Sequence, residues 1–169
     1  KNFKFLLKQY FRFKIPSVAN YYCACGEEAG KFLFKNKEFT VIPNAIEADH
    51  FVFDASVRKE IRTSLGADGK TVIGHVGRFS YQKNHNFLIS LFHELHKKYG
   101  NTLLFLIGVG EKENEIKQKV QSLGLSDSVI FFGNRSDVNR LYQAMDVFLM
   151  PSLFEGVPVA GIEAQFSGL

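Results

Sequence analysis

Two basic side chains stand at the end of an apolar segment, in the sequence GRFSYQKN of residues 77–84. Arg78 and Lys83, with Gly77 before them, would place two cations at the mouth of one strand. Such a pair suits a diphosphate that must be held and then released with additional negative charge. Either residue alone could equally be a solvated loop cation, so other segments must complete a site.

Two glutamates, Glu155 and Glu163, are separated by seven residues in the segment PSLFEGVPVAGIE. A helix that begins near Val159 would place Glu163 in its second turn, where a carboxylate can accept both hydroxyls of a ribose. Glu155 would precede that helix and could meet a sugar hydroxyl or a developing positive charge. Gly156 removes a side chain where the turn enters the helix, so free N–H groups there could bind phosphate oxygens. In isolation, Glu163 would be an ordinary surface residue of a helix.

Two more loops carry polar residues after apolar runs. The first, GVGE, lacks the third glycine of a dinucleotide-binding fingerprint and predicts a plain strand-to-loop turn. The second, GNRSD, contains Asn134 and Arg135. We interpret Asp137, at the end of this loop, as a charge at a helix N-terminus rather than a catalyst.

The histidines and cysteines are more simply explained by packing than by chemistry. His75 falls inside an expected strand and is predicted to be a core residue, while His85 either approaches a phosphate or simply begins a helix. Cys23 and Cys25 point to the same face of an expected strand, where a disulfide between them would be strained. No neighbouring His or Cys completes a metal set, so we interpret them as buried free thiols in a reducing cytoplasm.

Short apolar runs alternate with amphipathic segments along the chain. The pattern predicts strands at residues 19–26, 39–46, 71–78, 102–110, 128–133 and 146–152, and helices at 27–35, 55–66, 84–100, 112–125, 137–145 and from about 159. Strands that are apolar on both faces and alternate with helices predict an α/β fold: a Rossmann-like, doubly wound parallel sheet with helices on both faces. Ligands of such sheets bind beyond the carboxyl ends of the strands, where all the polar loops above fall.

Composition is ordinary for a globular α/β protein of 169 residues, with 46% hydrophobic and 22% charged residues. The net charge of +4 is uneven: residues 1–40 hold eight Lys or Arg against three Asp or Glu, and the rest thirteen against fourteen. The basic, aromatic segment KNFKFLLKQYFRFK could form a helix on anionic lipid, or one that packs on a neighbouring domain. No apolar run reaches the length that spans a bilayer, and no signal peptide is evident.

Taken together, these segments resemble the C-terminal, donor-binding domain of retaining glycosyltransferases of family 4 with the GT-B fold, in the style of capsule and exopolysaccharide enzymes. The matching segments are VIPNAIE, HVGRFSYQKN, LIGVGE, VIFFGNRSDV and MDVFLMPSLFEGVPVAGIEAQFSGL. The resemblance implies that residues 1–40 are a remnant of the N-terminal domain and that 41–169 are a nucleotide-sugar-binding domain, incomplete at its C-terminus. We therefore expect a fragment that is inactive by itself, and Ala45 departs from a glycine common in the family.

The same resemblance implies a role for each matching residue. Arg78 and Lys83 would clamp the donor diphosphate, Glu155 would lie by the transferred sugar, and Glu163 would hold the ribose. Backbone groups of Gly77, Asn134 and Arg135 would supply further contacts to the donor. Backbone N–H groups from Gly156 to Val159 would supply the rest, namely those of Gly156, Val157 and Val159, while Pro158 has no N–H. Such enzymes need no metal or other cofactor, and they transfer a glycosyl unit with retention through an oxocarbenium-like state.

The expected partners are a nucleoside-diphosphate sugar, with a UDP-sugar as the first choice, and a glycan or lipid-linked acceptor. A cytoplasmic place, with peripheral contact at the inner face of the membrane, fits this chemistry, and nucleic acid is not an expected partner. Two alternatives remain open at this point. One is a non-catalytic, flavodoxin-like module that binds a nucleotide or phosphate; the other is a GT-B sugar-nucleotide epimerase, which would need a different set of carboxylates.

Overall fold

The computed structural model describes residues 2–169, with side chains described from residue 6 onward except at positions 8, 12 and 16. The chain forms two compact units. Unit 1 contains the residues up to Ala45 together with Gly156–Pro158, and unit 2 contains Ile46–Glu155 and Val159–Leu169.

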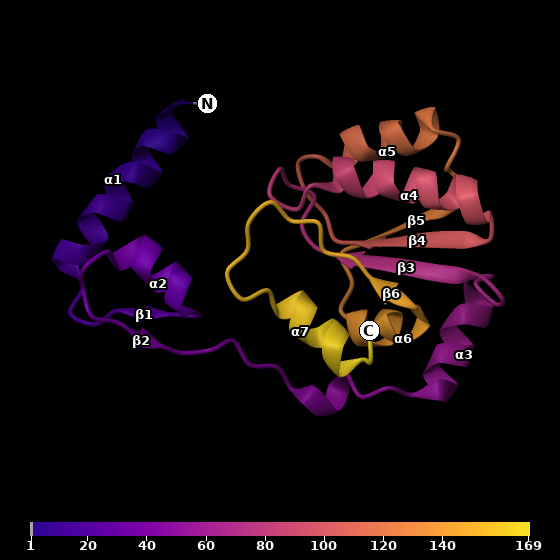
Figure 1. Ribbon diagram of the computed structural model, residues 1–169, viewed down its shortest axis with the longest axis horizontal. Helices are drawn as coiled ribbons and strands as arrows, with labels where there is room; N and C mark the ends of the chain where they lie inside the picture. Colours follow the sequence, from indigo (N-terminus) through magenta and orange to yellow (C-terminus); the bar gives the residue numbers. More distant parts are fainter. Residues whose placement is uncertain (1) are drawn as a thin grey trace. The chain divides into compact units, whose positions relative to one another are not determined.

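Unit 1 is small and mostly helical (Figure 1, indigo and purple). It comprises α1 (Asn2–Val18), β1 (Cys23–Ala24), α2 (Glu27–Phe34) and β2 (Thr40–Val41). β1 and β2 pair in parallel. Each is only two residues long, shorter than the predicted strands. Cys23 and Cys25 are free thiols, but Cys23 is exposed and Cys25 is partly exposed, so the prediction that they are buried is wrong. Among the described residues, no helix combines the length and the apolar character needed to cross a membrane.

Unit 2 is built on a parallel sheet with the strand order β5-β4-β3-β6. The strands are β3 (Thr71–Val76), β4 (Thr102–Ile107), β5 (Val129–Gly133) and β6 (Val147–Phe148). A short 3-10 turn (Ala48–His50) precedes the helices α3 (Ala55–Ser64), α4 (His85–Tyr99), α5 (Glu113–Ser122), α6 (Val138–Ala144) and α7 (Val159–Phe166). This architecture confirms the predicted α/β class and the helix start near Val159.

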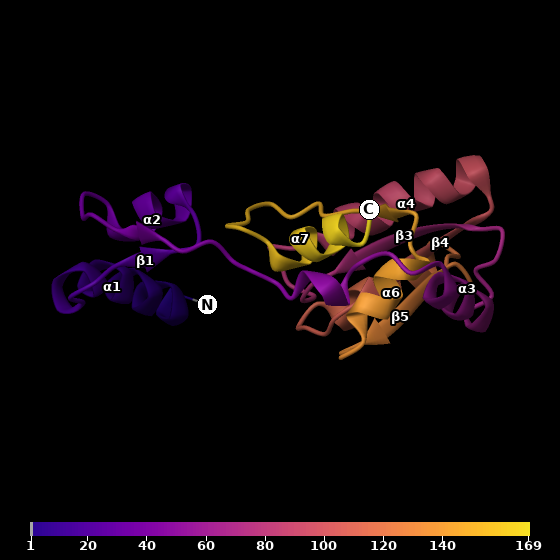
Figure 2. The same cartoon turned by 90° about the horizontal axis from the view of Figure 1, so that it is seen from below.

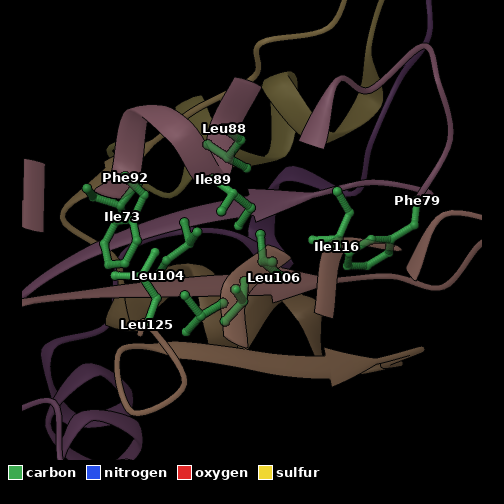
Figure 3. Close-up of a cluster of buried hydrophobic side chains, with 11 residues drawn as sticks. Ile73, Phe79, Leu88, Ile89, Phe92, Leu104, Leu106, Ile116 and Leu125 are labelled. Atoms are coloured by element: carbon green, nitrogen blue, oxygen red, sulfur yellow. The ribbon is translucent and has the colours of Figure 1, made fainter. Parts of the chain in front are cut away.

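Helices cover both faces of this sheet, α4 and α5 on one and α3, α6 and α7 on the other (Figure 1); Figure 2 views unit 2 from the side of α6 and α7. Side chains of a strand alternate between the two faces, so Leu104 and Leu106 join one buried cluster while Leu103 and Phe105 join the other. Figure 3 shows the first cluster, in which α4 side chains such as Phe92 meet the sheet. Because both faces are buried, the strands read as continuous apolar runs.

A charged network fastens α3 to the start of β6. Arg62 is nearly buried and donates to the carbonyl oxygens of Ala144 (2.9 Å) and Ala67 (2.8 Å), and it pairs with Asp146 at 3.1 Å. Arg58 binds the other oxygen of Asp146. Burial acts to raise the pKa of Asp146, but hydrogen bonds from the Val72 N–H and both arginines outweigh it and lower that pKa. The network therefore satisfies backbone carbonyls at the end of α6 and in the loop after α3.

Candidate functional site

Two loops at the carboxyl end of the sheet are joined side by side. Residues 77–84 follow β3, and residues 149–155 follow β6, which pairs with β3. The Gln82 carbonyl oxygen accepts from the Leu153 N–H (2.8 Å), and the Gln82 side-chain amide donates to the Phe154 carbonyl oxygen (2.8 Å). This pairing sets the register between the two loops, so that Glu155, at the end of the second loop, lies beside Lys83 of the first.

Lys83 and Glu155 form an ion pair at that point. The Lys83 Nζ lies 2.7 Å from the Glu155 Oε1, and the two side chains are only 17% and 21% exposed. Burial acts to raise the pKa of Glu155, but the hydrogen bond from Lys83 helps to outweigh it, and the pKa lies below its ordinary value. Glu155 is thus an anion held by a cation, and both side chains are partly shielded from water. Such a pair supplies fixed charge to a group bound beside it.

Gly77 lets the Lys83 stem lie close to the backbone. A Cβ atom at position 77 would come within 3.1 Å of the Lys83 Cε and 3.1 Å of the His75 Nε2. A side chain there would force the lysine stem or the His75 ring to shift by a few tenths of an ångström. Gly77, predicted as a donor-binding residue, therefore also shapes the ion pair.

Two buried histidines pack beside the same loops. His75 is fully buried, as predicted, and its Nδ1 lies 2.8 Å from the Leu149 carbonyl oxygen. His85 stacks on Phe79 with ring centroids 4.1 Å apart. Burial lowers the pKa of His75 to about 4 and, with His75 and Lys83 nearby, that of His85 to about 3. Both rings are neutral near pH 7, so they pack the base of the loops without adding charge, and the burial of His85 favours its interpretation as a helix-start residue.

A pocket of about 450 Å³ opens between the loops after β3, β4 and β5. Its lining residues are Val76, Gly77, Arg78, Ile107, Gly108, Val109, Gly110, Asn134, Arg135 and Val138. Two glycines of the GVGE segment allow the loops after β3 and β4, which border this pocket, to come close together. A Cβ at Gly108, whose φ is +136°, would lie 2.2 Å from the Gly77 carbonyl oxygen, and one at Gly110 would lie 2.4 Å from that of Phe79. The segment is a close-packed turn, as its missing third glycine indicates.

The predicted cations of this pocket have acidic neighbours. Arg78 is 75% exposed along its side chain, and its Nε lies 3.4 Å from the Glu111 Oε2. Arg135 makes two hydrogen bonds to Asp137, at 2.7 and 2.6 Å. This contact is the main reason that the pKa of Asp137 lies below its ordinary value. Asp137 directly precedes α6, where a helix N-terminal charge was expected. Exposed pairs of this kind exchange partners at little cost.

Glu163 lies in the second turn of α7, as the helix start at Val159 requires. Its Oε2 accepts a hydrogen bond of 3.0 Å from the hydroxyl of the buried Tyr142 on α6. Glu163 is partly exposed, and the phenol contacts its carboxylate from the side of the protein core.

The predicted site residues fall into three groups. Lys83, Glu155 and the stem-contacting Gly77 come together in the joined loops. The pocket gathers Gly77 with Arg78, Asn134 and Arg135, but its lining includes neither member of the ion pair and not Glu163. Gly156, Val157 and Pro158 group with unit 1. The site within unit 2 is therefore an ion pair, a neighbouring pocket and a carboxylate on α7.

Three residues that contact the candidate site were not singled out by the sequence: Gln82, Glu111 and Tyr142. Gln82 and Glu111 are polar residues in loops that the sequence had already marked as candidate binding loops. Their positions in these loops could therefore have indicated that they contact the other site residues. Tyr142 reads as an apolar helix residue, and its contact with Glu163 spans 21 positions of sequence. In the part of the chain that the structure describes, no three His, Cys, Asp or Glu residues are grouped as a metal site would need.

The fold is that of one half of GT-B glycosyltransferases. HepE of Anabaena, crystallised with UDP-glucose, superposes with a TM-score of 0.84 at 24% identity, covering 95% of this chain and 46% of HepE. WaaG, a glycosyltransferase involved in lipopolysaccharide biosynthesis, gives 0.78 at 24% identity, over 87% of this chain and 42% of WaaG. The C-terminal domain of LpcC, a group 1 glycosyl transferase from Francisella tularensis, gives 0.64 at 25% identity, over 73% and 67%.

The sequence narrows this class to a family. Residues 57–169 match the model of the glycosyl transferases group 1, and the chain belongs to that family. It is 38% identical over 165 residues to the putative glycosyltransferase EpsF of Bacillus subtilis, covering 94% of this chain and 43% of EpsF. It is 30% identical to the UDP-Gal:alpha-D-GlcNAc-diphosphoundecaprenol alpha-1,3-galactosyltransferase of Escherichia coli, over 78% of this chain and 35% of that protein. The chain thus spans less than half the length of these curated relatives.

Proposed function

We propose that the chain is the donor-binding part of a retaining glycosyltransferase of family 4 that uses a UDP-sugar. Its acceptor would be a glycan or a lipid-linked glycan in the synthesis of a cell-surface polysaccharide. The observation that carries this proposal is the Lys83–Glu155 pair, partly shielded from water at the carboxyl end of the sheet and next to the pocket. Ligands of open parallel sheets bind at this edge.

In this proposal the cations stabilise the leaving diphosphate. When the bond between sugar and diphosphate breaks, negative charge grows on the diphosphate oxygens, and the Lys83 ammonium would lie beside them. Arg78 would leave the exposed Glu111 for a phosphate oxygen, because an exposed ion pair contributes little by itself. We propose that these two side chains do the work that a divalent ion does in other transferases.

The two glutamates would act on opposite ends of the donor. Glu155 remains ionised, since its pKa is lowered, and it would face the positive charge that develops on the sugar ring. Glu163 would accept the ribose hydroxyls, and backbone groups near Asn134 and Arg135 would meet the uracil in the pocket. The acceptor would attack the anomeric carbon on the side from which the diphosphate leaves, which retains the configuration.

The donor and the setting are supported by relatives. The Escherichia coli relative is named for a UDP-galactose donor and a diphosphoundecaprenol acceptor, and another relative is the Vi polysaccharide biosynthesis protein VipC/TviE of Salmonella typhi. α1 exposes Phe11 (54%) and Phe13 (72%), which suits contact with a lipid surface that carries such an acceptor. We therefore propose a cytoplasmic enzyme in peripheral contact with the inner face of the membrane.

A transfer assay on the full-length protein tests this function. We expect release of UDP from a UDP-sugar in the presence of an undecaprenyl-diphosphate-linked sugar, with activity undiminished by EDTA. Proton NMR of the product should show the anomeric configuration of the donor. An inverted product would contradict the retaining mechanism, loss of activity in EDTA would contradict the role given to the cations, and no turnover with any nucleoside-diphosphate sugar would contradict the transferase itself.

A further inference from the structure

Tyr142 is a fully buried tyrosine whose ring is fixed on two sides. The ring centroid lies 6.1 Å from that of Phe51 and 5.7 Å from that of Phe148, both in edge-on arrangements. An aromatic ring packed in this way cannot swing to a new position without opening the core. The position of its hydroxyl is therefore set by the core of unit 2.

That hydroxyl reaches out of the core to α7. It lies 3.0 Å from the Glu163 Oε2 and 3.1 Å from the Ala160 carbonyl oxygen. Burial, followed by the charge of Glu163 and the hydrogen bond to it, raises the pKa of Tyr142 well above its ordinary value. The phenol therefore keeps its proton at every physiological pH and shares that one proton between two acceptors on α7, the Glu163 carboxylate and the Ala160 carbonyl oxygen.

α6 connects this contact to the pocket. Val138, the first residue of α6, lines the pocket, and Tyr142 follows four positions later on the same face of the helix. The Glu163 carboxylate thus rests on the helix whose beginning forms a pocket wall. Among the described residues, the other carboxylate oxygen, Oε1, has no hydrogen-bond partner.

We infer that Tyr142 is a positioning residue that fixes the Glu163 carboxylate for the ribose of the donor. By holding Oε2 it sets the rotamer of Glu163 and leaves Oε1 directed to accept ribose hydroxyls. A carboxylate held in place before binding loses less conformational entropy when the ligand arrives. This inference rests on the ribose-binding role proposed for Glu163.

The test is calorimetric titration of full-length Tyr142→Phe, which keeps the buried ring and removes only the hydroxyl oxygen. We expect UDP to bind about tenfold more weakly, because a Glu163 side chain released from the phenol must first be immobilised when the ribose binds. The affinity for 2′,3′-dideoxy-UDP, which lacks both ribose hydroxyls, should stay unchanged. A purely structural role would weaken both ligands equally, and that result would overturn the inference. Tyr99→Phe, at an exposed tyrosine, is the matched control and should change neither affinity.

Glu163→Gln separates this inference from the function on which it rests. We expect Glu163→Gln to weaken UDP, and adding Tyr142→Phe to it should weaken UDP less than twofold further, because the two side chains act as one unit. If Glu163→Gln weakens UDP and Tyr142→Phe does not, the positioning role is wrong while the ribose-binding role stands. If Glu163→Gln itself leaves UDP affinity unchanged, the ribose-binding role is wrong.

Discussion

Replacing Lys83 with alanine in the full-length protein is expected to lower turnover at saturating donor by about a hundredfold or more, since removing one preorganised group from a developing anion costs about 3 kcal/mol. The lysine side chain is only 17% exposed, so its charge is screened less than in solution. Its main contribution would come as the diphosphate leaves. The Michaelis constant for the donor should therefore change less than the rate.

Folding should suffer much less than turnover from this change. The two loops keep the Gln82 hydrogen bonds to Leu153 and Phe154, which do not involve the lysine. Glu155 would lose its cation, so its pKa should rise toward the ordinary value. Lys112→Ala is the matched control, because Lys112 also pairs with a glutamate (Glu115, 2.8 Å) but on the exposed start of α5. A rate unchanged by Lys83→Ala at saturating donor would remove Lys83 from the mechanism.

Replacing Arg62 with methionine is expected to have the largest effect on stability, lowering the free energy of unfolding by about 3 kcal/mol, because buried backbone carbonyl oxygens lose their hydrogen-bond donor. The side chain is only 10% exposed and makes bonds to Ala144, Ala67 and Asp146 at once. Methionine fills similar volume but donates nothing, so the carbonyl oxygens of Ala144 and Ala67 lose this donor, whereas Asp146 keeps Arg58 and the Val72 N–H. Urea unfolding of the full-length protein should show a lower midpoint with an unchanged slope.

Arg140→Met provides the control for that measurement. Arg140 on α6 pairs with Glu60 on α3 at 2.7 Å, so it joins the same two helices, but the two side chains are 38% and 64% exposed. We expect a change of less than about 0.5 kcal/mol in this variant. Equal effects of the two substitutions would mean that the network around Asp146 does not fasten α3.

The parallel sheet was predictable because each of its longer strands is buried on both faces. A strand with one solvent-exposed face would alternate apolar and polar residues, whereas residues 103–106 are all apolar. Both faces of this strand therefore had to be buried, and helices had to cover both sides of the sheet. The short strands were less predictable. β6 has two residues because its chain soon leaves the sheet for the joined loop, and that depends on contacts such as Gln82 with Leu153.

The candidate site was predictable in its residues but not in its pairings. Lys83 and Glu155 were marked by type and by position after strands, yet their direct contact follows from a loop register that no local pattern encodes. Glu163 could be placed on α7 by counting from the helix start. Its hydrogen bond from the Tyr142 hydroxyl could not be predicted, because it depends on how α6 packs against α7. Arg78 and Lys83 were expected to act together, and the structure gives each its own acidic partner.

Binding of UDP to the full-length protein, compared with UMP by calorimetric titration, tests the claim that this edge of the sheet grips a diphosphate. UDP should bind at least about tenfold more tightly than UMP, because the second phosphate adds a charge-assisted contact with Lys83. Equal affinities for UDP and UMP, or no binding of either, would contradict it.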